Sequence, residues 1–348
     1  MNTRVEVLSR HVRAGGAGAR PIGVIQVGLG PIGIRMIKDI FTRKGIVLTG
    51  AVDIDPRKIG RDVAEIADLP APTGITVKKP SELYTIPGDV CIVTTVSSLD
   101  RLYPAIEQCV SCGKHVVSSC EELSYPFASH PALAAKIDAL AKQHNVAVLG
   151  TGINPGFLMD TLPVLLSGLC RDVKTVRVER HQDSRIRRLP FQQKIGAGLD
   201  MDQWVELRDK GKIRHVGFAQ SIHLIAHALG WKLDSTDEVI EPVIATRDVS
   251  SPLLKVPAGK CCGVRQTAHG YMDGKAVITL ELCANNGLEH PHDTVILEGT
   301  PNVRSSIGGG VHGDISTSAI IINCVQSLVH AQPGLRTMTD IPVIHWLK

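Results

Sequence analysis

The chain has 348 residues, 43% of them hydrophobic and 21% charged, which is typical of a globular protein that buries a full core in one or two domains. Its 38 basic and 34 acidic residues form no long basic block, so the charge pattern excludes the electrostatic footprint of a nucleic-acid-binding protein. No apolar run is long enough for a transmembrane helix, so we expect no membrane partner, and the odd count of nine cysteines argues against a disulfide framework.

Residues 1–21 precede the first predicted strand and form a predicted N-terminal extension. The segment carries several arginines against a single acid, Glu6, which is a feature of organelle transit peptides, but it lacks their serine richness. It also contains no secretory hydrophobic region. We therefore expect a cytoplasmic protein, with N-terminal targeting as the alternative.

A glycine-rich turn follows the first predicted strand, in the stretch IGVIQVGLGPIG at residues 22–33. Its glycines have the GxGxxG spacing that dinucleotide-binding folds use between the first strand and the first helix. Gly28 permits a tight turn, Gly30 lets the backbone approach a pyrophosphate, and Gly33 lets the helix lie close to the strand. The predicted cofactor-binding residues of this turn are Gly28, Gly30, Pro31, Ile32 and Gly33.

A second predicted strand, IVLTGAV, ends at Asp53, twenty residues after Gly33. An acid at this place accepts hydrogen bonds from the adenosine ribose hydroxyls, and its charge repels the 2′-phosphate of NADP. Arg57 and Lys58 lie close enough in the sequence to accommodate that phosphate. We therefore predict that Asp53 and Arg57 contact the cofactor, that NAD is favoured and that NADP is also used.

Strands and helices alternate from residue 22 to residue 150, which predicts a Rossmann-type parallel sheet with right-handed crossovers. After Asp53 the predicted elements are a helix at 56–69, a strand at 89–96, a helix at 99–114, a strand at 114–120, a helix at 131–145 and a strand at 146–150. We predict that residues 22–150 form the NAD(P)-binding domain.

The pattern changes after Gly150, where period-two alternation predicts strands with one solvated face. The predicted strands lie at 173–183, 238–249, 263–274, 276–285 and 292–300, and the predicted helices lie near 154–169, 200–211 and 217–230. We predict an α+β substrate domain with a largely antiparallel sheet at residues 151–312. Residues 313–348 are predicted to form a helix and a tail that return to the Rossmann domain. The fold class is therefore α/β.

Residues that follow two of the predicted parallel strands are candidates for the reactive site, since nicotinamide lies beyond the carboxyl ends of such strands. Thr95, Val96 and Ser97 follow one strand and are predicted to lie along the cofactor. Glu121 and Glu122 follow the next strand, where nicotinamide and substrate are expected. Burying carboxylates is costly unless a partner or a function compensates, and the alternative is that the pair caps the following turn.

A carboxylate at that position suits imine chemistry. Hydride transfer to a carbonyl usually uses Tyr, His or Lys as the proton donor, whereas imine reduction requires a group that stabilises a cationic iminium and shuttles protons. An anionic glutamate favours the iminium over the neutral ketone, and burial can raise its pKa toward neutrality. The sequence therefore predicts an oxidoreductase that acts on carbon–nitrogen bonds.

Five ordered segments together resemble the 2,4-diaminopentanoate dehydrogenase family, including relatives described as native amine dehydrogenases. They are VIQVGLGPIG at 24–33, SSCEELSYP at 118–126, GTGINPGFLMDTLP at 150–163, KIGAGL at 194–199 and GGGVHGDISTSA at 308–319. The resemblance covers residues 22 to about 330. It implies a Rossmann domain, an α/β substrate and dimerisation domain, a homodimer, and reversible NAD(P)H-dependent reductive amination of small ketones or aldehydes with ammonia. It also implies Glu121 as the catalytic residue, with Glu122 as the alternative.

The second half of the chain holds further candidates. The resemblance makes Asn154 a candidate for cofactor contact and Pro155, Phe157 and Met159 candidates for substrate contact, against helix capping and core packing as the alternatives. His312, in the glycine-rich segment before the last helix, is a candidate pocket residue, with a simple turn as the alternative.

A basic cluster follows the first predicted strand of the second domain, and Arg180 and His181 are its candidates for substrate contact. A solvated face is the alternative interpretation. If the substrate carries a carboxylate, a bidentate arginine is expected here. The residues alone leave open whether the substrate is a diamino acid or a plain aliphatic amine.

No metal site is predicted. Cys109 and Cys112 have CxxC spacing on a predicted helix, but a second pair is missing from the sequence, so core packing is favoured. His290 and His292 flank a proline and lack the further ligands that a metal requires.

Other functions stay open at this point. One is a 2,4-diaminopentanoate dehydrogenase acting on a diamino acid, and another is a related reductase such as dihydrodipicolinate reductase or homoserine dehydrogenase. The segment ERHQDSRIRR at 179–188 lacks the histidine pair of dihydrodipicolinate reductase. The segment CEEL at 120–123 stands where homoserine dehydrogenase has Asn-Lys. A protein that binds a dinucleotide without catalysis is the third alternative.

Overall fold

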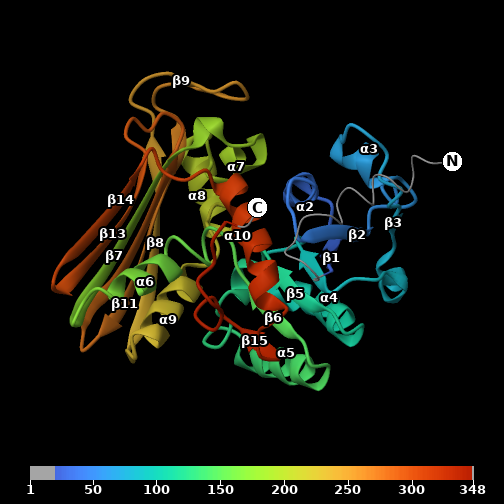
Figure 1. Ribbon diagram of the computed structural model, residues 1–348. Helices are drawn as coiled ribbons and strands as arrows, with labels where there is room; N and C mark the ends of the chain where they lie inside the picture. Colours follow the sequence, from blue (N-terminus) through green and yellow to red (C-terminus); the bar gives the residue numbers. More distant parts are fainter. Residues whose placement is uncertain (1–19, 347–348) are drawn as a thin grey trace. The chain divides into compact units, whose positions relative to one another are not determined.

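The computed structural model describes residues 20–346, and the described chain divides into two compact units (Figure 1). The first unit extends to Ile153 and resumes at Asp314, and the second comprises Asn154–Gly313. The predictions for the N-terminal extension fall on residues outside the described part, apart from Arg20 and the residue that follows it. Arg20 forms an ion pair with Asp89, in which Nη2 and Oδ1 are 2.6 Å apart.

The first unit is built on a parallel sheet with the strand order β15-β6-β5-β4-β1-β2-β3. Its strands are β1 (Ile22–Val27), β2 (Ile46–Val52), β3 (Val77–Lys78), β4 (Val90–Val93), β5 (His115–Ser118), β6 (Ala147–Gly150) and β15 (Gly334–Arg336). Its helices are α2 (Pro31–Ile40), α3 (Val63–Ala67), α4 (Leu99–Ser111), α5 (Pro131–Gln143) and α10 (Gly313–Leu328), with short turns η1 (Pro80–Thr85) and η2 (Glu121–Leu123). The chain order reverses beside β1, which lies between β2 and β4, and such a switch point is where open α/β sheets bind their ligands.

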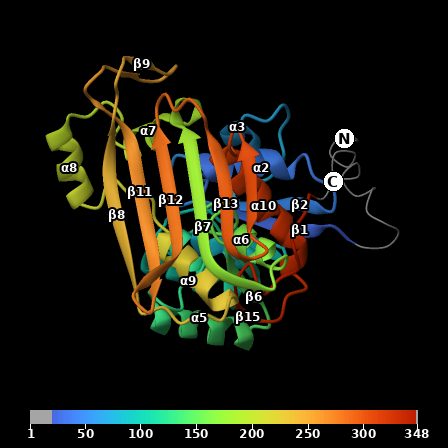
Figure 2. The ribbon, with the colours of Figure 1, turned by 90° about the vertical axis from the view of Figure 1, so that its left-hand side faces the viewer.

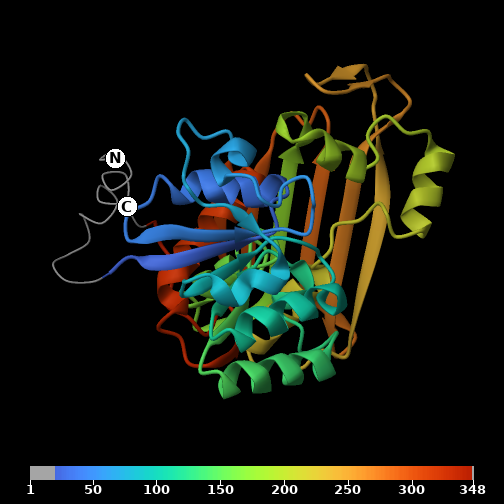
Figure 3. The same ribbon diagram turned by 90° about the vertical axis from the view of Figure 1, so that its right-hand side faces the viewer.

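Helices lie on both faces of this sheet. Figure 3 shows α2, in blue, above the blue strands, and α4 and α5, in teal and green, below them. The α4–α5 side contains a buried apolar cluster that includes Leu102, Ile106 and Ile137. On the other side, Ser318 of α10 donates a hydrogen bond of 2.5 Å to Asp39 of α2. The two-sided cover explains why the strands are almost continuously apolar.

The second unit is built on a mixed sheet with the strand order β14-β13-β7-β12-β11-β8, shown in Figure 2. The strands are β7 (Asp172–Asp183), β8 (Ser235–Ile244), β11 (Cys261–Met272), β12 (Lys275–Asn285), β13 (His292–Thr300) and β14 (Val303–Gly308), and a short hairpin pairs β9 (Val249–Ser250) with β10 (Lys255–Val256). Neighbouring strands are antiparallel except β7 and β12, which are parallel. The α/β fold class, with a Rossmann-type sheet and a largely antiparallel second sheet, is confirmed.

Helices cover one face of the second sheet. They are α6 (Thr161–Ser167), α7 (Leu189–Lys194), α8 (Met201–Asp209) and α9 (Phe218–Ala228), with the short turn η3 (Ser184–Ile186) after β7. A core that includes Val176, Val178, Trp204 and Phe218 fills the space between these helices and the sheet. Because side chains alternate along a strand, the residues between the two valines and beyond them face the opposite side.

We call that opposite side the polar sheet face. It carries charged side chains from neighbouring strands: Arg177, Glu179 and His181 on β7, Glu281 on β12, Arg265 on β11 and His292 on β13. Figure 2 shows the strands of this sheet in front of the helices that cover its other side. The expected period-two pattern, with one apolar and one polar face, is therefore present.

Two predicted helices are wrong in their bounds. The helix predicted at 154–169 begins only at Thr161, because Asp160 caps it by accepting a hydrogen bond from the Thr161 N–H, and Asn154 is not the N-cap residue. The helix predicted at 56–69 is reduced to Val63–Ala67. Here Gly60 has a positive φ of +85°, which interrupts the helical path, and Asp62 caps the short helix that follows.

Candidate functional site

The glycine turn between β1 and α2 is fastened to the strands around it. Gly28 has a positive φ of +87°, and its N–H donates to Val52 O of β2 at 2.8 Å. A Cβ built on Gly33 would lie 2.0 Å from Gly28 O, whereas a Cβ on Gly30 would meet no atom within 4 Å. The backbone at Gly30 is therefore open to an approaching group, while Gly33 is required for the close approach of helix and turn. Pro31 and Ile32 form the first residues of α2.

Two polar side chains beneath this turn were missed by the sequence analysis. Gln26 is fully buried in β1, and its Nε2 donates to Gly28 O at 2.9 Å and to Thr94 Oγ1 at 2.8 Å. Thr94, at the end of β4, also donates to Gly28 O at 3.1 Å. The signal that could have found Gln26 is a lone polar residue inside an otherwise apolar strand, because such a side chain needs buried hydrogen-bond partners.

Asp53, after β2, holds the middle of the turn. Its Oδ2 accepts hydrogen bonds from the Leu29 N–H at 2.6 Å and from Lys58 Nζ at 3.2 Å, and its Oδ1 accepts from the Asp55 N–H at 2.8 Å. Burial raises the pKa of Asp53, but the hydrogen bonds from Asp55, Leu29 and Lys58 outweigh this and hold the pKa below its ordinary value. Asp53 is therefore an anion whose strongest contacts are within the protein.

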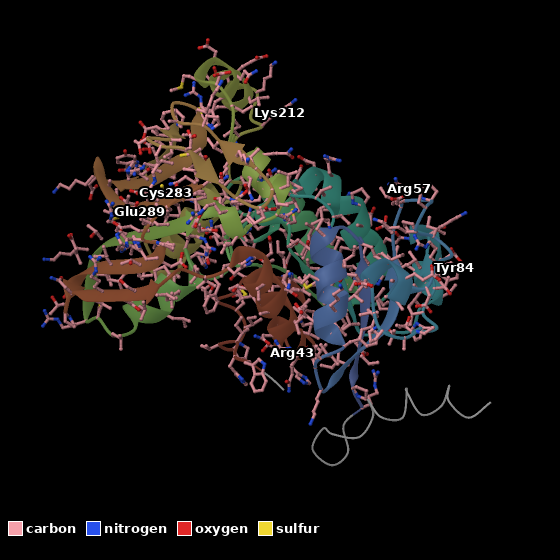
Figure 4. The ribbon with its side chains drawn as sticks, turned by 90° about the horizontal axis from the view of Figure 1, so that it is seen from above. Arg43, Arg57, Tyr84, Lys212, Cys283 and Glu289 are labelled. Carbon is pink, nitrogen blue, oxygen red and sulfur yellow. The ribbon has the colours of Figure 1, made fainter. Side chains whose placement is uncertain are left out.

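The two basic residues near Asp53 differ in their contacts. Lys58 Nζ also donates to Leu29 O at 3.0 Å, so its ammonium lies against both the acid and the glycine turn. Arg57 forms an ion pair of 2.8 Å with Asp55, is 88% exposed and points away from the ribbon (Figure 4). Lys58 thus neutralises the acid at the end of β2.

The ends of β4 and β5 are joined by several hydrogen bonds. Ser118 Oγ donates to Val93 O at 2.8 Å, and the Cys120 thiol donates to Ser97 O at 3.1 Å. These contacts bring the segment with Thr95, Val96 and Ser97 next to the turn η2, which begins with Glu121 and Glu122. Both predicted groups of strand-end residues therefore meet at one edge of the first unit.

The segment after β6 is anchored by residues that the sequence analysis did not select. Asp160 is buried and accepts hydrogen bonds from the Gly156 N–H at 2.7 Å and from Ser221 Oγ at 2.7 Å. Burial raises the pKa of Asp160, although these donors act in the opposite direction. The backbone of Asn154 accepts from His215 at 3.0 Å, and Gly217 lies against Pro155. The sequence signal that could have found Asp160 is its residue type, because aspartate is a preferred N-cap residue directly before a run that forms a helix.

A pocket in the second unit contains two of the predicted substrate residues, Met159 and Arg180. It is a small pocket, with room for about one water molecule, between the segment before α6 and strands β7, β13 and β14. Arg180 is 2% exposed, and its Nη1 lies 3.8 Å from Asp293 Oδ1. Among residues 20–346, neither of these two atoms has a hydrogen-bond partner. The pocket therefore contains an ion pair with unused hydrogen-bonding capacity.

His215 lies among three cations of the second unit. Its pKa is lowered to about 3, because burial disfavours the charged ring and because Lys194, Arg180 and Arg187 repel a further positive charge. The ring is therefore neutral at physiological pH and contacts Asn154 O.

The remaining predicted substrate residues lie elsewhere in the second unit. His181 is on the polar sheet face, opposite to Arg180, where its Nε2 lies 2.9 Å from Glu281 Oε1 and its ring lies 4.5 Å from that of His292. Phe157 is half-buried before α6, and its carbonyl accepts a hydrogen bond from the Leu162 N–H. His312 is half-buried between β14 and α10. The structure does not bring Arg180 and His181 together, because adjacent strand residues face opposite sides.

Three further features concern the described part of the chain. Within residues 20–346 no group of three or more His, Cys, Asp or Glu side chains is arranged to hold a metal ion. Within the same residues, no helix has the length and apolar character needed to cross a membrane. All nine cysteines fall in this part and are free thiols, and Figure 4 labels one of them, Cys283 of β12.

Comparisons with known proteins identify relatives over most of the chain. Residues 157–348 match the family described as 2,4-diaminopentanoate dehydrogenase C-terminal domain. A 2,4-diaminopentanoate dehydrogenase from Acetoanaerobium sticklandii is 31% identical, over 92% of this chain and 94% of the relative. An amine dehydrogenase from Streptomyces virginiae is 24% identical, over 92% and 96%. The solved amine dehydrogenase from Mycobacterium smegmatis superimposes with a TM-score of 0.83 at 20% identity, over 97% and 98% of the two chains, and shows a shared fold.

The contacts of Lys58 generate a prediction about cofactor choice. In Lys58→Met the charge of Asp53 loses its neutralising ammonium, so we expect the affinity for NADPH to fall more than that for NADH, by about tenfold in the ratio of Kd values, equivalent to about 1.4 kcal/mol. Arg57→Met is the matched control, and it should leave this ratio unchanged because the guanidinium of Arg57 pairs with Asp55 rather than with Asp53. Fluorescence titration measures both constants. A ratio that changes in Arg57→Met but not in Lys58→Met would contradict the assignment.

Proposed function

The chain belongs to the 2,4-diaminopentanoate dehydrogenase family and is an NAD(P)-dependent oxidoreductase acting on CH–NH₂ groups, and we propose that it interconverts a small amine with a ketone or aldehyde and ammonia. In the aminating direction, a carbonyl compound, ammonia, NAD(P)H and a proton give an amine, NAD(P)⁺ and water. The observation that carries the proposal is a glutamate pair at the carboxyl end of β5, beside the loop that follows β4.

The glycine turn supports the cofactor assignment. The open backbone at Gly30 leaves room for a pyrophosphate, and the N-terminus of α2 offers free N–H groups to its charge. The bound nicotinamide supplies the hydride in this chemistry. Asp53 and Lys58 fix the conformation of the turn through Leu29, so that the anion meets a backbone that is already ordered.

Glu121 is the residue that we propose as the catalytic acid and base. A carboxylate beside the reacting carbon stabilises the cationic iminium formed from ketone and ammonia. The same group accepts a proton from the attacking ammonia and returns one to the departing water during collapse of the carbinolamine. Resemblance to the family supports Glu121 over Glu122.

The first test is the oxidation of NADH and NADPH by a panel of small ketones and aldehydes, with and without ammonium. We expect consumption only with ammonium, and we expect Glu121→Gln to lower kcat by about 100-fold or more while the Kd for NADH changes little, since the amide cannot transfer protons. Glu65→Gln, an exposed glutamate paired with Arg61, is the control and should behave like the wild type. Cofactor oxidation that is independent of ammonium would contradict imine reduction, and binding without any turnover would favour a non-catalytic protein.

We further propose that the substrate carries a carboxylate, as a diamino acid does. The support is the pocket in which Arg180 Nη1 has hydrogen-bonding capacity left. Arginine binds a carboxylate in two parallel hydrogen bonds, which gives both orientation and affinity. Asp293 lies beside Arg180 and would compete with the substrate carboxylate for the guanidinium. An ammonium group on the same substrate would remove this competition by pairing with Asp293.

Matched substrates test this second proposal. An oxo acid and a methyl ketone of equal carbon number are compared in ammonium-dependent turnover, and we expect kcat/KM to favour the oxo acid by about tenfold or more. Removing Arg180 alone would leave Asp293 as an unpaired buried charge, so the variant is Arg180→Gln combined with Asp293→Asn. This double variant should lose the preference and keep its activity on the ketone. An unchanged preference for the acid would exclude the pair as the carboxylate site.

We also propose that two chains associate through the polar sheet face. Charges of both signs lie close together on it, for example Arg177 between Glu179 and Glu281, at 2.7 and 3.3 Å. A two-fold axis, the commonest symmetry of oligomers, brings a surface against a second copy of itself, and a surface with both signs lets opposite charges meet there. The resemblance to the family, which implies a homodimer, supports the same arrangement.

Light scattering on the eluted protein tests the association. We expect the mass of two chains for the wild type and of one chain for Val239→Arg, because Val239 is 49% exposed and shares the polar sheet face with its neighbour Thr267 on β11. A new charge there costs the single chain little but opposes contact with a second copy. Val343→Arg, at an exposed valine of the first unit, is the control and should stay dimeric. A wild type that elutes as one chain would exclude the proposal.

A further inference from the structure

Helix α4 is capped by a side chain from another segment. The N-cap residue, Ser98, makes no side-chain cap hydrogen bond in the described structure. Instead Glu122 Oε2 accepts a hydrogen bond of 2.7 Å from the N–H of Leu99, the first residue of the helix. An anionic acceptor at a helix N-terminus also interacts favourably with the helix dipole, so this contact is stronger than a neutral cap.

The same turn holds the loop before α4 at a second point. The carbonyl oxygen of Ser97 accepts a hydrogen bond of 3.1 Å from the Cys120 thiol. It also accepts a longer hydrogen bond of 3.5 Å from the backbone N–H of Glu122. Residues 120–122 therefore contact both the last loop residue, through its carbonyl, and the start of the helix, through Leu99. The loop and the turn that bear the proposed cofactor and catalytic residues are joined at these points.

A third element reaches the Glu122 carboxylate. His130, the residue that precedes α5, lies with its Nε2 3.6 Å from Glu122 Oε2 and 3.9 Å from Asp100 Oδ2. The Glu122 side chain is 24% exposed, so it is enclosed on most sides by α4, by the start of α5 and by its own turn. Its oxygen Oε2 accepts the hydrogen bond from the Leu99 N–H and is also the oxygen that lies near His130, so three segments meet at this carboxylate.

We propose that Glu122 is a positioning residue that fixes the loop of residues 95–97 relative to Glu121. The inference rests on the proposed function, in which that loop lies along the nicotinamide and Glu121 serves the reacting nitrogen. The two adjacent acids then have different roles. Glu121 acts on the substrate, and Glu122 keeps Glu121 at the correct position relative to the cofactor. Displacements of about 1 Å between reacting groups lower rates by about 100-fold, so such a contact is of direct consequence for turnover.

The experiment compares Glu122→Gln and Glu122→Leu. The amide keeps an acceptor for the Leu99 N–H without the charge, whereas leucine removes the acceptor. We expect kcat of the ammonium-dependent reaction to fall about threefold in Glu122→Gln and about 30-fold in Glu122→Leu, and the Kd for NADH to rise about tenfold in the leucine variant only. Glu107, which accepts a hydrogen bond from Tyr103 on the same helix, provides the control, and Glu107→Leu should leave both quantities unchanged.

A rescue variant separates positioning from simple helix stability. Ser98→Asp gives α4 a cap of its own, so in Glu122→Leu it should restore the unfolding temperature but not kcat. Restoration of kcat as well would show that Glu122 serves only helix stability and would overturn the proposal. A loss of kcat in Glu122→Gln as large as that in Glu122→Leu, with unchanged NADH affinity, would instead assign Glu122 a proton-transfer role and also overturn it.

Failure of the proposed function is distinguishable from failure of this inference. If the wild type shows no ammonium-dependent turnover, the amine reaction is wrong, and the Kd for NADH still reports on the loop. In that case an increase in Kd for Glu122→Leu that Glu122→Gln avoids supports the positioning contact. Equal NADH affinity in all three proteins contradicts it.

Discussion

The backbone of the glycine turn has its inward-facing groups satisfied by neighbouring strands, and the arrangement of the first unit depends on this. Gly28 is held through its N–H by β2 and through its carbonyl by Gln26 and Thr94. Leu29 is held through its N–H by Asp53 and through its carbonyl by Lys58. Because the turn is already ordered without a ligand, binding does not incur the entropy cost of ordering it. The contacts from the strands therefore favour dinucleotide binding, because they fix the conformation of the turn.

The same construction recurs at the next strand ends. Loops after β4 and β5 carry few residues of regular structure, yet Ser118, Cys120 and Glu122 fasten one to the other by side-chain contacts. In a parallel sheet these ends are adjacent by topology, so short side chains suffice to join them. Polar side chains at these strand ends therefore hold the backbone of the neighbouring loop. A pair of adjacent acids need not be a catalytic pair, because one of them, Glu122, caps the start of α4.

Sequence patterns were sufficient for the sheets and the glycine turn, because strand periodicity and glycine spacing are local properties. They were not sufficient for contacts between segments distant along the chain. Asp53 was correctly placed after its strand, but its engagement by Leu29 and Lys58 depends on how β2 lies beside β1. The late start of α6 depends on Asp160, which also binds Ser221 from α9. His181 was grouped with Arg180 by proximity in sequence, although a strand turns neighbours to opposite faces.

Fold alone does not separate this chain from other oxidoreductases of the same architecture, because the likeness to the solved amine dehydrogenase at 20% identity concerns the backbone. The chemistry is set by a few strand-end side chains. A nitrogen-directed site needs an anion near the hydride acceptor, since the iminium is cationic, whereas a carbonyl reductase needs a proton donor. In the first unit the glutamates of η2 lie at the carboxyl end of β5, whereas Asp53 is already paired with Lys58. An anionic glutamate at this strand end therefore matches the charge of an iminium rather than that of a neutral ketone.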